Sequence, residues 1–194
     1  GGGLVVYRGG AATLINSTVS GNIGGGGDPE EIGWGGGADN TGGSLSLYGS
    51  TVTLNVGGTG GLVGPATLAN TIVAGNTRLF SEQPSDCTGT VTSQGYNLIG
   101  NTNGCSISGD ITGNLLNVAA NLGPLQKNGG PTFTHALQPG SRAIDAGNPA
   151  TPGSTATACA TKDQRNVVRP RDGNGDGVAR CDIGAVERKS ASTP

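Results

Sequence analysis

The chain has 194 residues and a formal net charge of −2, and its 39 glycines and 10 prolines make up about a quarter of it. Aromatic residues account for 3% and charged residues for 12%, which excludes a helical bundle, a coiled coil and a basic nucleic-acid-binding domain. The sequence has no collagen-like Gly-X-Y period and no apolar run long enough to cross a membrane. Low charge and recurrent β-branched runs favour a folded all-β chain over a disordered one.

Four short segments of similar pattern recur along the first half of the chain. Each passes through a strand-like apolar stretch and closes on an asparagine, and the closing residues are Asn22, Asn55, Asn76 and Asn101. Their spacings are about 33, 21 and 25 residues, and an insertion over 24–34 accounts for the longest. A period in the twenties with Gly-rich turns is typical of a solenoid, whose rungs bury apolar residues only against neighbouring rungs. We expect four to five rungs over residues 1–121, with the closing asparagines stacked in a hydrogen-bonded ladder.

The C-terminal third carries a more specific signature. It reads Leu122-Gly-Pro-Leu-Gln-Lys-Asn-Gly-Gly-Pro-Thr-Phe-Thr-His-Ala-Leu-Gln-Pro-Gly-Ser141, Ala143-Ile-Asp-Ala-Gly-Asn-Pro149, Asp163-Gln-Arg165, Arg169-Pro-Arg-Asp-Gly-Asn-Gly-Asp-Gly177 and Cys181-Asp-Ile-Gly-Ala-Val-Glu187. This order resembles the choice-of-anchor Q domain of bacterial secreted and surface proteins. The preceding repeats resemble the rungs of right-handed parallel β-helix proteins of the pectate-lyase-like superfamily. The family usually has Pro at the position of Arg142 and Gly at that of Asn166.

The resemblance implies an all-β fold, a right-handed parallel β-helix with an irregular C-terminal cap. The region 122–187 would be continuous with the solenoid, and 188–194 would form a tail. The family's common theme is export followed by varied C-terminal anchoring, so the resemblance implies a secreted or cell-surface protein. No sorting motif is readable in the tail, and we expect the anchor to be absent, cleaved or replaced.

The four cysteines form two local pairs in the sequence. An even count in a chain of this composition fits an oxidising compartment, and the lack of closely spaced Cys or His pairs argues against zinc. Four cysteines allow three connectivities. Because the partners are near each other in sequence, we expect Cys87 to bond with Cys105 and Cys159 with Cys181.

The segment from Asp172 to Gly177 is a candidate calcium loop. Asp172, Asn174 and Asp176 alternate with glycines, as in the opening half of a calcium-binding loop. The closing glutamate is missing, since Ile183 occupies position 12; Asp182, one residue short of it, is the fourth candidate ligand. The alternative is a tight turn in which Asp and Asn side chains cap their own backbone.

No catalytic group is assigned from the sequence. The single histidine, His135, is expected to be a hydrogen-bonded structural residue, because no Gly-x-Ser-x-Gly nucleophile motif accompanies it. The acids of the rung region do not repeat on successive rungs as a glycosidase pair would require; they are Asp28, Glu30, Glu31, Asp39, Glu82, Asp86 and Asp110. By the resemblance, the remaining charged group forms a buried ion-pair network; it comprises Asp145, Asp163, Arg165, Arg169 and Asp182. Threonine pairs such as Thr51/Thr53 and Thr90/Thr92 are similar to ice-binding patches, but we expect no repetition in register over enough rungs.

These features favour a non-catalytic extracellular structural or adhesive solenoid, such as a filament subunit or surface stalk. The N-terminal stretch from Gly1 to Tyr7 already reads as a rung, so we expect end-to-end self-association or continuation in a longer chain. The alternative is a carbohydrate-active lyase or hydrolase, or a carbohydrate-binding β-helix. Neither a nucleic-acid partner nor a membrane span is expected.

Overall fold

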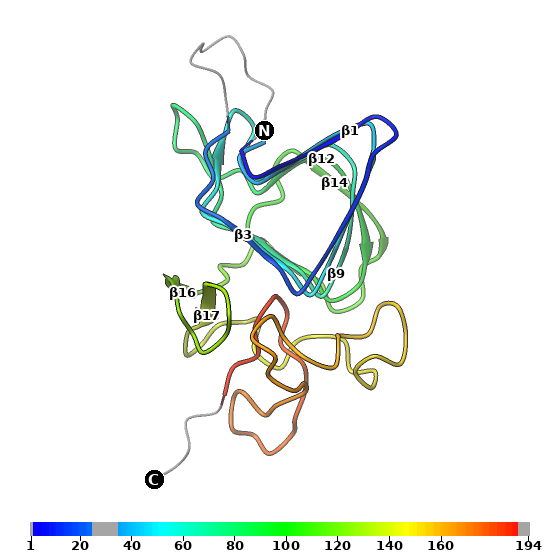
Figure 1. Ribbon diagram of the computed structural model, residues 1–194, viewed down its shortest axis with the longest axis vertical. Helices are drawn as coiled ribbons and strands as arrows, with labels where there is room; N and C mark the ends of the chain where they lie inside the picture. The colour runs from blue at the N-terminus through cyan, green and yellow to red at the C-terminus, as the bar shows by residue number, and fades with distance from the viewer. Residues whose placement is uncertain (1, 25–34, 190–194) are drawn as a thin grey trace.

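A computed structural model describes residues 2–24 and 35–189, which contain strands, turns and loops and no helix (Figure 1). The chain coils through five rungs. The first rung has β1 (Leu4–Tyr7), β2 (Ala11–Ile15) and β3 (Thr18–Ser20). The second has β4 (Ala38–Thr41), β5 (Ser44–Tyr48), β6 (Thr51–Thr53) and β7 (Val56–Gly57). The third has β8 (Leu62–Val63), β9 (Ala66–Ala69), β10 (Ile72–Ala74) and β11 (Thr77–Arg78). The fourth has β12 (Cys87–Gln94) and β13 (Leu98–Ile99), and the fifth has β14 (Cys105–Asp110) and β15 (Leu115–Leu116). An antiparallel hairpin of β16 (Leu122–Gln126) and β17 (Thr134–Leu137) follows.

Equivalent strands of successive rungs pair in parallel and form three sheets. The first sheet contains β1, β4, β8 and the start of β12, and the second contains β2, β5, β9, the end of β12 and β14. The third contains β3, β6, β10, β13 and β15, while β7 and β11 pair separately. The sequence-based expectation of an all-β, parallel solenoid is thereby confirmed.

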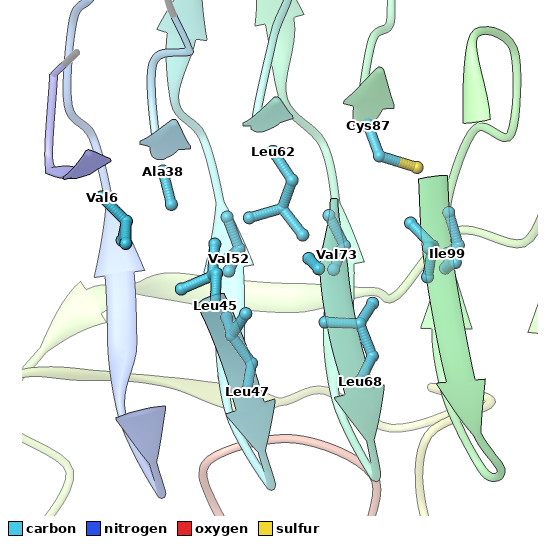
Figure 2. Close-up of a cluster of buried hydrophobic side chains, with 12 residues drawn as sticks. Val6, Ala38, Leu45, Leu47, Val52, Leu62, Leu68, Val73, Cys87 and Ile99 are labelled. Atoms are coloured by element: carbon cyan, nitrogen blue, oxygen red, sulfur yellow. The ribbon is translucent and has the colours of Figure 1, made fainter. Parts of the chain in front are cut away.

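The interior of the coil is filled by apolar side chains stacked from rung to rung. Leu14, Leu47 and Leu68 pair in register along the second sheet, and Figure 2 shows the columns of the core side by side. Side chains alternate between inside and outside along each strand of this sheet, so the neighbouring Ser46 and Thr67 face outward. Because each column crosses several rungs, burial depends on stacking and not on any one rung.

A ladder of amide side chains runs along one corner of the coil. The Oδ1 of Asn55 accepts hydrogen bonds from the backbone N–H and Nδ2 of Asn22, and the Oδ1 of Asn76 accepts the same pair from Asn55. The next acceptor is Asp86 and not Asn101, so the expectation that Asn101 is the fourth member was wrong. The backbone before β12 brings Asp86 to that corner, and its carboxylate accepts both Asn76 donors.

A second ladder, which the repeat pattern did not predict, follows the corner between the second and third sheets. Its acceptor oxygens belong to Ser50, Thr71, Asn97 and Asn114. In both ladders the backbone N–H of one rung donates to the side chain of the next. The hydrogen bonds of both ladders therefore run in the same direction along the coil.

Both disulfides have the expected pairing. Cys87–Cys105 joins the fourth rung to the fifth, with 5.4 Å between the Cα atoms. Cys159–Cys181, with 6.6 Å between its Cα atoms, closes a loop within the C-terminal region. No free cysteine is present, which fits an oxidising compartment.

The C-terminal region, residues 122–187, lies beside the coil and not across an end. The view in Figure 1 shows the coil and this region side by side. Lys162 O accepts from Asn16 on the first rung, the N–H of Ala185 donates to Thr51 on the second, and that of Gly184 donates to Asn70 O on the third.

The outer face of the third sheet is the docking surface for this region. Ile72 and Leu98 point outward there and form a second apolar cluster with Leu137, Ile183 and Val186. Their neighbours Val73 and Ile99 belong to the inner core. The third sheet is thus buried on both faces, which explains its continuous apolar run Ile72-Val73-Ala74.

Candidate functional site

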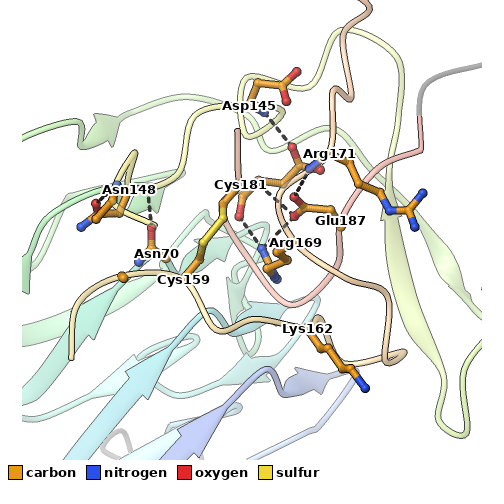
Figure 3. Close-up of a disulfide and its surroundings, with 12 residues drawn as sticks. Asn70, Asp145, Asn148, Cys159, Lys162, Arg169, Arg171, Cys181 and Glu187 are labelled. Carbon is orange, nitrogen blue, oxygen red and sulfur yellow. Dashed lines mark hydrogen bonds and ion pairs between the residues drawn. A yellow bond between two sulfur atoms is a disulfide. The ribbon is translucent and has the colours of Figure 1, made fainter. Parts of the chain in front are cut away.

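A buried ionic network holds the segment that docks on the third sheet (Figure 3). The Nη1 of Arg169 donates to Glu187 Oε2 and to Asp182 O at 2.9 Å, and its Nη2 donates to Gly184 O at 2.7 Å. Arg169 is 4% exposed and Glu187 1%. The network expected from the resemblance is present, and Glu187 is its unforeseen centre.

A second ion pair is joined to the first through the backbone. Arg165 Nη2 lies 2.6 Å from Asp163 Oδ2, and that oxygen also accepts from the backbone N–H of Glu187 at 2.9 Å. Asp145 also belongs to the network. Its N–H donates to Asp182 Oδ1 at 2.7 Å, and its carboxylate accepts from the N–H groups of Gly173 and Asn174. These bonds fix the chain path on both sides of Ile183.

The pKa values of the buried carboxyl groups are shifted in opposite directions. Burial, with repulsion from Glu187, raises the pKa of Asp182 to about 7. Burial also raises the pKa of Glu187, although Arg169 opposes the shift. Burial by itself would raise the pKa of Asp163, but hydrogen bonds from the Glu187 backbone and Arg165 outweigh it and lower the pKa below its usual range. The stability of the network should therefore depend on pH, and the raised pKa values of Asp182 and Glu187 determine the sign of that dependence above their ordinary pKa values.

The candidate calcium residues have other partners. Asp172 accepts from the backbone N–H groups of Gly175 and Gly177 at 2.6 and 2.9 Å. Asn174 Oδ1 accepts from the N–H of Asp176, whose own Oδ1 accepts from that of Val178. This is the pattern of side chains that cap their own turn.

The fourth proposed ligand, Asp182, is fully buried, and its two oxygens accept from the N–H groups of Asp145 and Arg188. Within residues 2–24 and 35–189, no three His, Cys, Asp or Glu side chains form a group that could hold a metal ion. The geometry therefore favours the turn over the calcium loop.

We expect millimolar calcium to leave the melting temperature of the protein unchanged, because the loop's carboxylates are already bonded to backbone. Thermal melts with and without calcium, after removal of divalent ions, measure this. A ligand present at 100 times its Kd would add about 2.7 kcal/mol. A rise of several degrees that Asp172→Asn abolishes would show instead that the loop binds calcium.

The acids of the rung region occupy separate elements. Asp39 lies in β4, buried, and accepts from the N–H of Gly35, while Glu82 lies in the turn after β11 and Asp110 ends β14. Asp86 ends the asparagine ladder. The insertion acids Asp28, Glu30 and Glu31 lie outside the described residues. The described acids do not form the stacked row that a polysaccharide-cleaving site on a solenoid would need.

A groove runs between the coil and the β16–β17 hairpin. Its volume is about 410 Å³, and its walls include Leu54, Ala74, Asp86, Leu122 and His135. Burial raises the pKa of Asp86, although hydrogen bonds from Asn76 oppose the shift. The groove is thus mainly apolar, with one buried carboxylate and one imidazole in its walls.

His135 is 2% exposed and has a partner on each ring nitrogen. Its Nδ1 lies 2.7 Å from Gly123 O, and its Nε2 lies 2.7 Å from the Oγ of Ser20. The sequence predicted a hydrogen-bonded histidine but gave no reason to select Ser20, which is 115 residues away.

The edge of the first rung is a further unusual feature. The apolar side chains that point inward there, Leu4, Ala12, Leu14 and Val19, pack on the core but are only partly buried. Within the described residues no strand pairs with the outer edge of β1, β2 or β3. This edge presents unpaired backbone groups beside half-covered apolar side chains.

The fold and these features define an all-β parallel solenoid with two disulfides and a C-terminal region docked on its side. No helix of the described residues is long and apolar enough to cross a membrane. Comparison with known protein families, curated proteins and solved structures finds no match to this chain.

Proposed function

We propose that this chain is an extracellular structural module, a right-handed parallel β-helix of the choice-of-anchor Q kind, whose end rungs stack on those of a second copy. The observation that carries the proposal is that the C-terminal region docks on the side of the coil, so that among the described residues no strand pairs with the outer edge of the first rung or of the last. A head-to-tail contact between unlike surfaces does not close and produces a filament. The two disulfides suit secretion or display on a cell surface.

The last rung offers a matching edge. Ile107 of β14 points inward and is only partly buried, and no strand among the described residues pairs beyond β14 or β15. In both ladders each rung donates N–H groups to the side-chain oxygens of the next rung, so the last rung of one copy would face the Asn22 oxygen of another. Stacking in this direction would extend the parallel sheets from one copy into the next.

A proline at the first-rung edge tests the proposal. Asn16 N–H donates to Tyr48 O and Gly10 O accepts from Ser44 N–H, so the even-numbered residues of this stretch direct their backbone groups toward β5. Backbone groups alternate between the two sides of a strand in a parallel pair, so the N–H of Thr13 points to the unpaired edge. Thr13→Pro blocks that edge without removing a hydrogen bond to β5. We expect the native chain to form concentration-dependent oligomers and filaments, and Thr13→Pro to remain monomeric.

Analytical ultracentrifugation and electron microscopy measure the outcome. Thr13→Val is the matched control, because it keeps the N–H and the β-branched shape, and it should associate like the native chain. A native chain that stays monomeric at high concentration would overturn self-association.

Carbohydrate binding is a second candidate, favoured by the outer face of the second sheet. A column of hydroxyl side chains crosses all five rungs in register; it consists of Thr13, Ser46, Thr67, Thr92 and Ser108. Within the described residues none of these hydroxyls bonds to another protein group, and the rungs repeat at about 4.8 Å. Of the threonine pairs considered in the sequence, Thr92 lies in this column beside Thr67, whereas Thr51 and Thr53 are buried in the third sheet.

Binding to insoluble polysaccharides tests this candidate. If the hydroxyl column contacts glycan chains, the native chain should sediment with cellulose, chitin or pectin particles, and the double variant Thr92→Val with Ser108→Ala should lose most of this binding. The variant Thr155→Val, on an exposed loop of the C-terminal region, is the control. Equal retention of all three proteins would contradict a role for the column.

A further inference from the structure

Ser20 and His135 form a pair with the geometry of a serine nucleophile and its base. Ser20 ends β3 on the first rung and is half-buried, and His135 lies in β17 of the C-terminal region. The docking of that region places Ser20 Oγ 2.7 Å from His135 Nε2. The contact exists only because the C-terminal region lies along the side of the coil.

The partners of the ring assign its tautomer. Nδ1 lies 2.7 Å from the carbonyl oxygen of Gly123, which can only accept, so Nδ1 carries the hydrogen. In the neutral imidazole Nε2 then has a lone pair, and the Ser20 hydroxyl donates to it. The Gly123 carbonyl thus orients the imidazole, and the imidazole accepts from the serine hydroxyl. This is the arrangement that activates a serine nucleophile.

The apolar groove adjoins this pair. His135 lines it, and so does Thr53, which is paired in register with Ser20 on the neighbouring strand. Leu54, Ala74 and Leu122 supply apolar walls, while the carboxyl group of Asp86 disfavours a negatively charged occupant. The groove therefore suits a neutral acyl chain.

We propose that Ser20 is a nucleophile activated by His135 and accepts acyl groups from neutral carboxylic esters. Ser20 Oγ attacks the ester carbonyl carbon, and its proton moves to His135 Nε2. The bond from that carbon to the alcohol oxygen breaks, and the leaving alcohol takes the proton from Nε2. Water then attacks the acyl carbon and gives a proton to Nε2; the bond from that carbon to Ser20 Oγ breaks, the acid leaves, and Oγ takes the proton back from Nε2.

Labelling with a fluorophosphonate probe tests the nucleophile directly. In this reaction the Oγ–P bond forms, the P–F bond breaks with loss of fluoride, and the proton passes to Nε2. Peptide mass spectrometry of the full chain should find the probe on Ser20 and not on the exposed Ser106 and Ser108, which serve as internal controls. Ser20→Ala should abolish labelling, and His135→Gln should slow it by about 10²-fold or more.

The same samples should hydrolyse p-nitrophenyl acetate in proportion to their labelling. A folded native chain that leaves Ser20 unlabelled, under conditions that label a serine esterase, would overturn the proposal. Labelling of Ser20 that a folded His135→Gln variant leaves unchanged would also overturn it. If His135→Gln fails to fold by circular dichroism, the native chain and Ser20→Ala still decide the outcome.

Discussion

Replacement of Arg169 by methionine should lower the free energy of unfolding by about 3–5 kcal/mol, the usual cost of removing one partner from a buried ion pair. The variant leaves Glu187 buried without its counter-charge, and it also leaves the carbonyls of Asp182 and Gly184 without their donor. Because these residues flank Ile183, the apolar contact with the third sheet should loosen with them. Urea unfolding of the native and variant chains measures the loss.

Arg171→Met is the matched control for this experiment. Arg171 is two residues away and exposed, and among the described residues its side chain bonds only to the carbonyl of Val168. A surface change of this kind usually stays within about 0.5 kcal/mol. Hydrogen exchange should show faster opening of the C-terminal region in Arg169→Met alone. Equal stability of the two variants would contradict the assigned role of the network.

The unfolding free energy should fall as the pH rises from about 4 to about 7. The pKa of Asp182 is raised from 3.8 to about 7, so between these values the folded protein holds a proton that the unfolded chain releases. The stabilisation is complete below the unfolded pKa and is lost as the pH passes the folded pKa. Glu187 and Asp86 act in the same direction, because their pKa values are also raised. A shift of this size corresponds to at most about 4 kcal/mol.

Asp163 sets the opposite trend at lower pH. Its pKa is lowered, so its contribution is present above the unfolded pKa and is lost as the pH falls through the folded pKa. Stability should therefore be highest near pH 4. Urea unfolding from pH 3 to pH 8 measures the profile, and Asp182→Asn should flatten the slope between pH 4 and 7 whatever its effect on absolute stability. A native profile that rises over that interval would contradict the assignment.

The sequence alone was enough to predict the rungs and their stacking. A solenoid repeats the same local contacts, so each copy of the pattern reports the same turn and the same inward side chains. Asn22, Asn55 and Asn76 could be matched because their spacing follows the rungs. The disulfide partners were found because they are near in sequence and the domain is small.

The tertiary structure decided what is not periodic. Asp86 replaces Asn101 in the ladder because the path into the fourth rung carries a carboxylate to that corner. The apolar run Ile72-Val73-Ala74 does not show by itself which residue faces the core; in the structure Val73 packs in the inner core, while Ile72 is buried under the C-terminal region on the other face of the third sheet. The contact of Ser20 with His135 has the same origin. Such contacts depend on how an irregular segment docks, and because that segment occurs once, no repeat in the sequence records its partners.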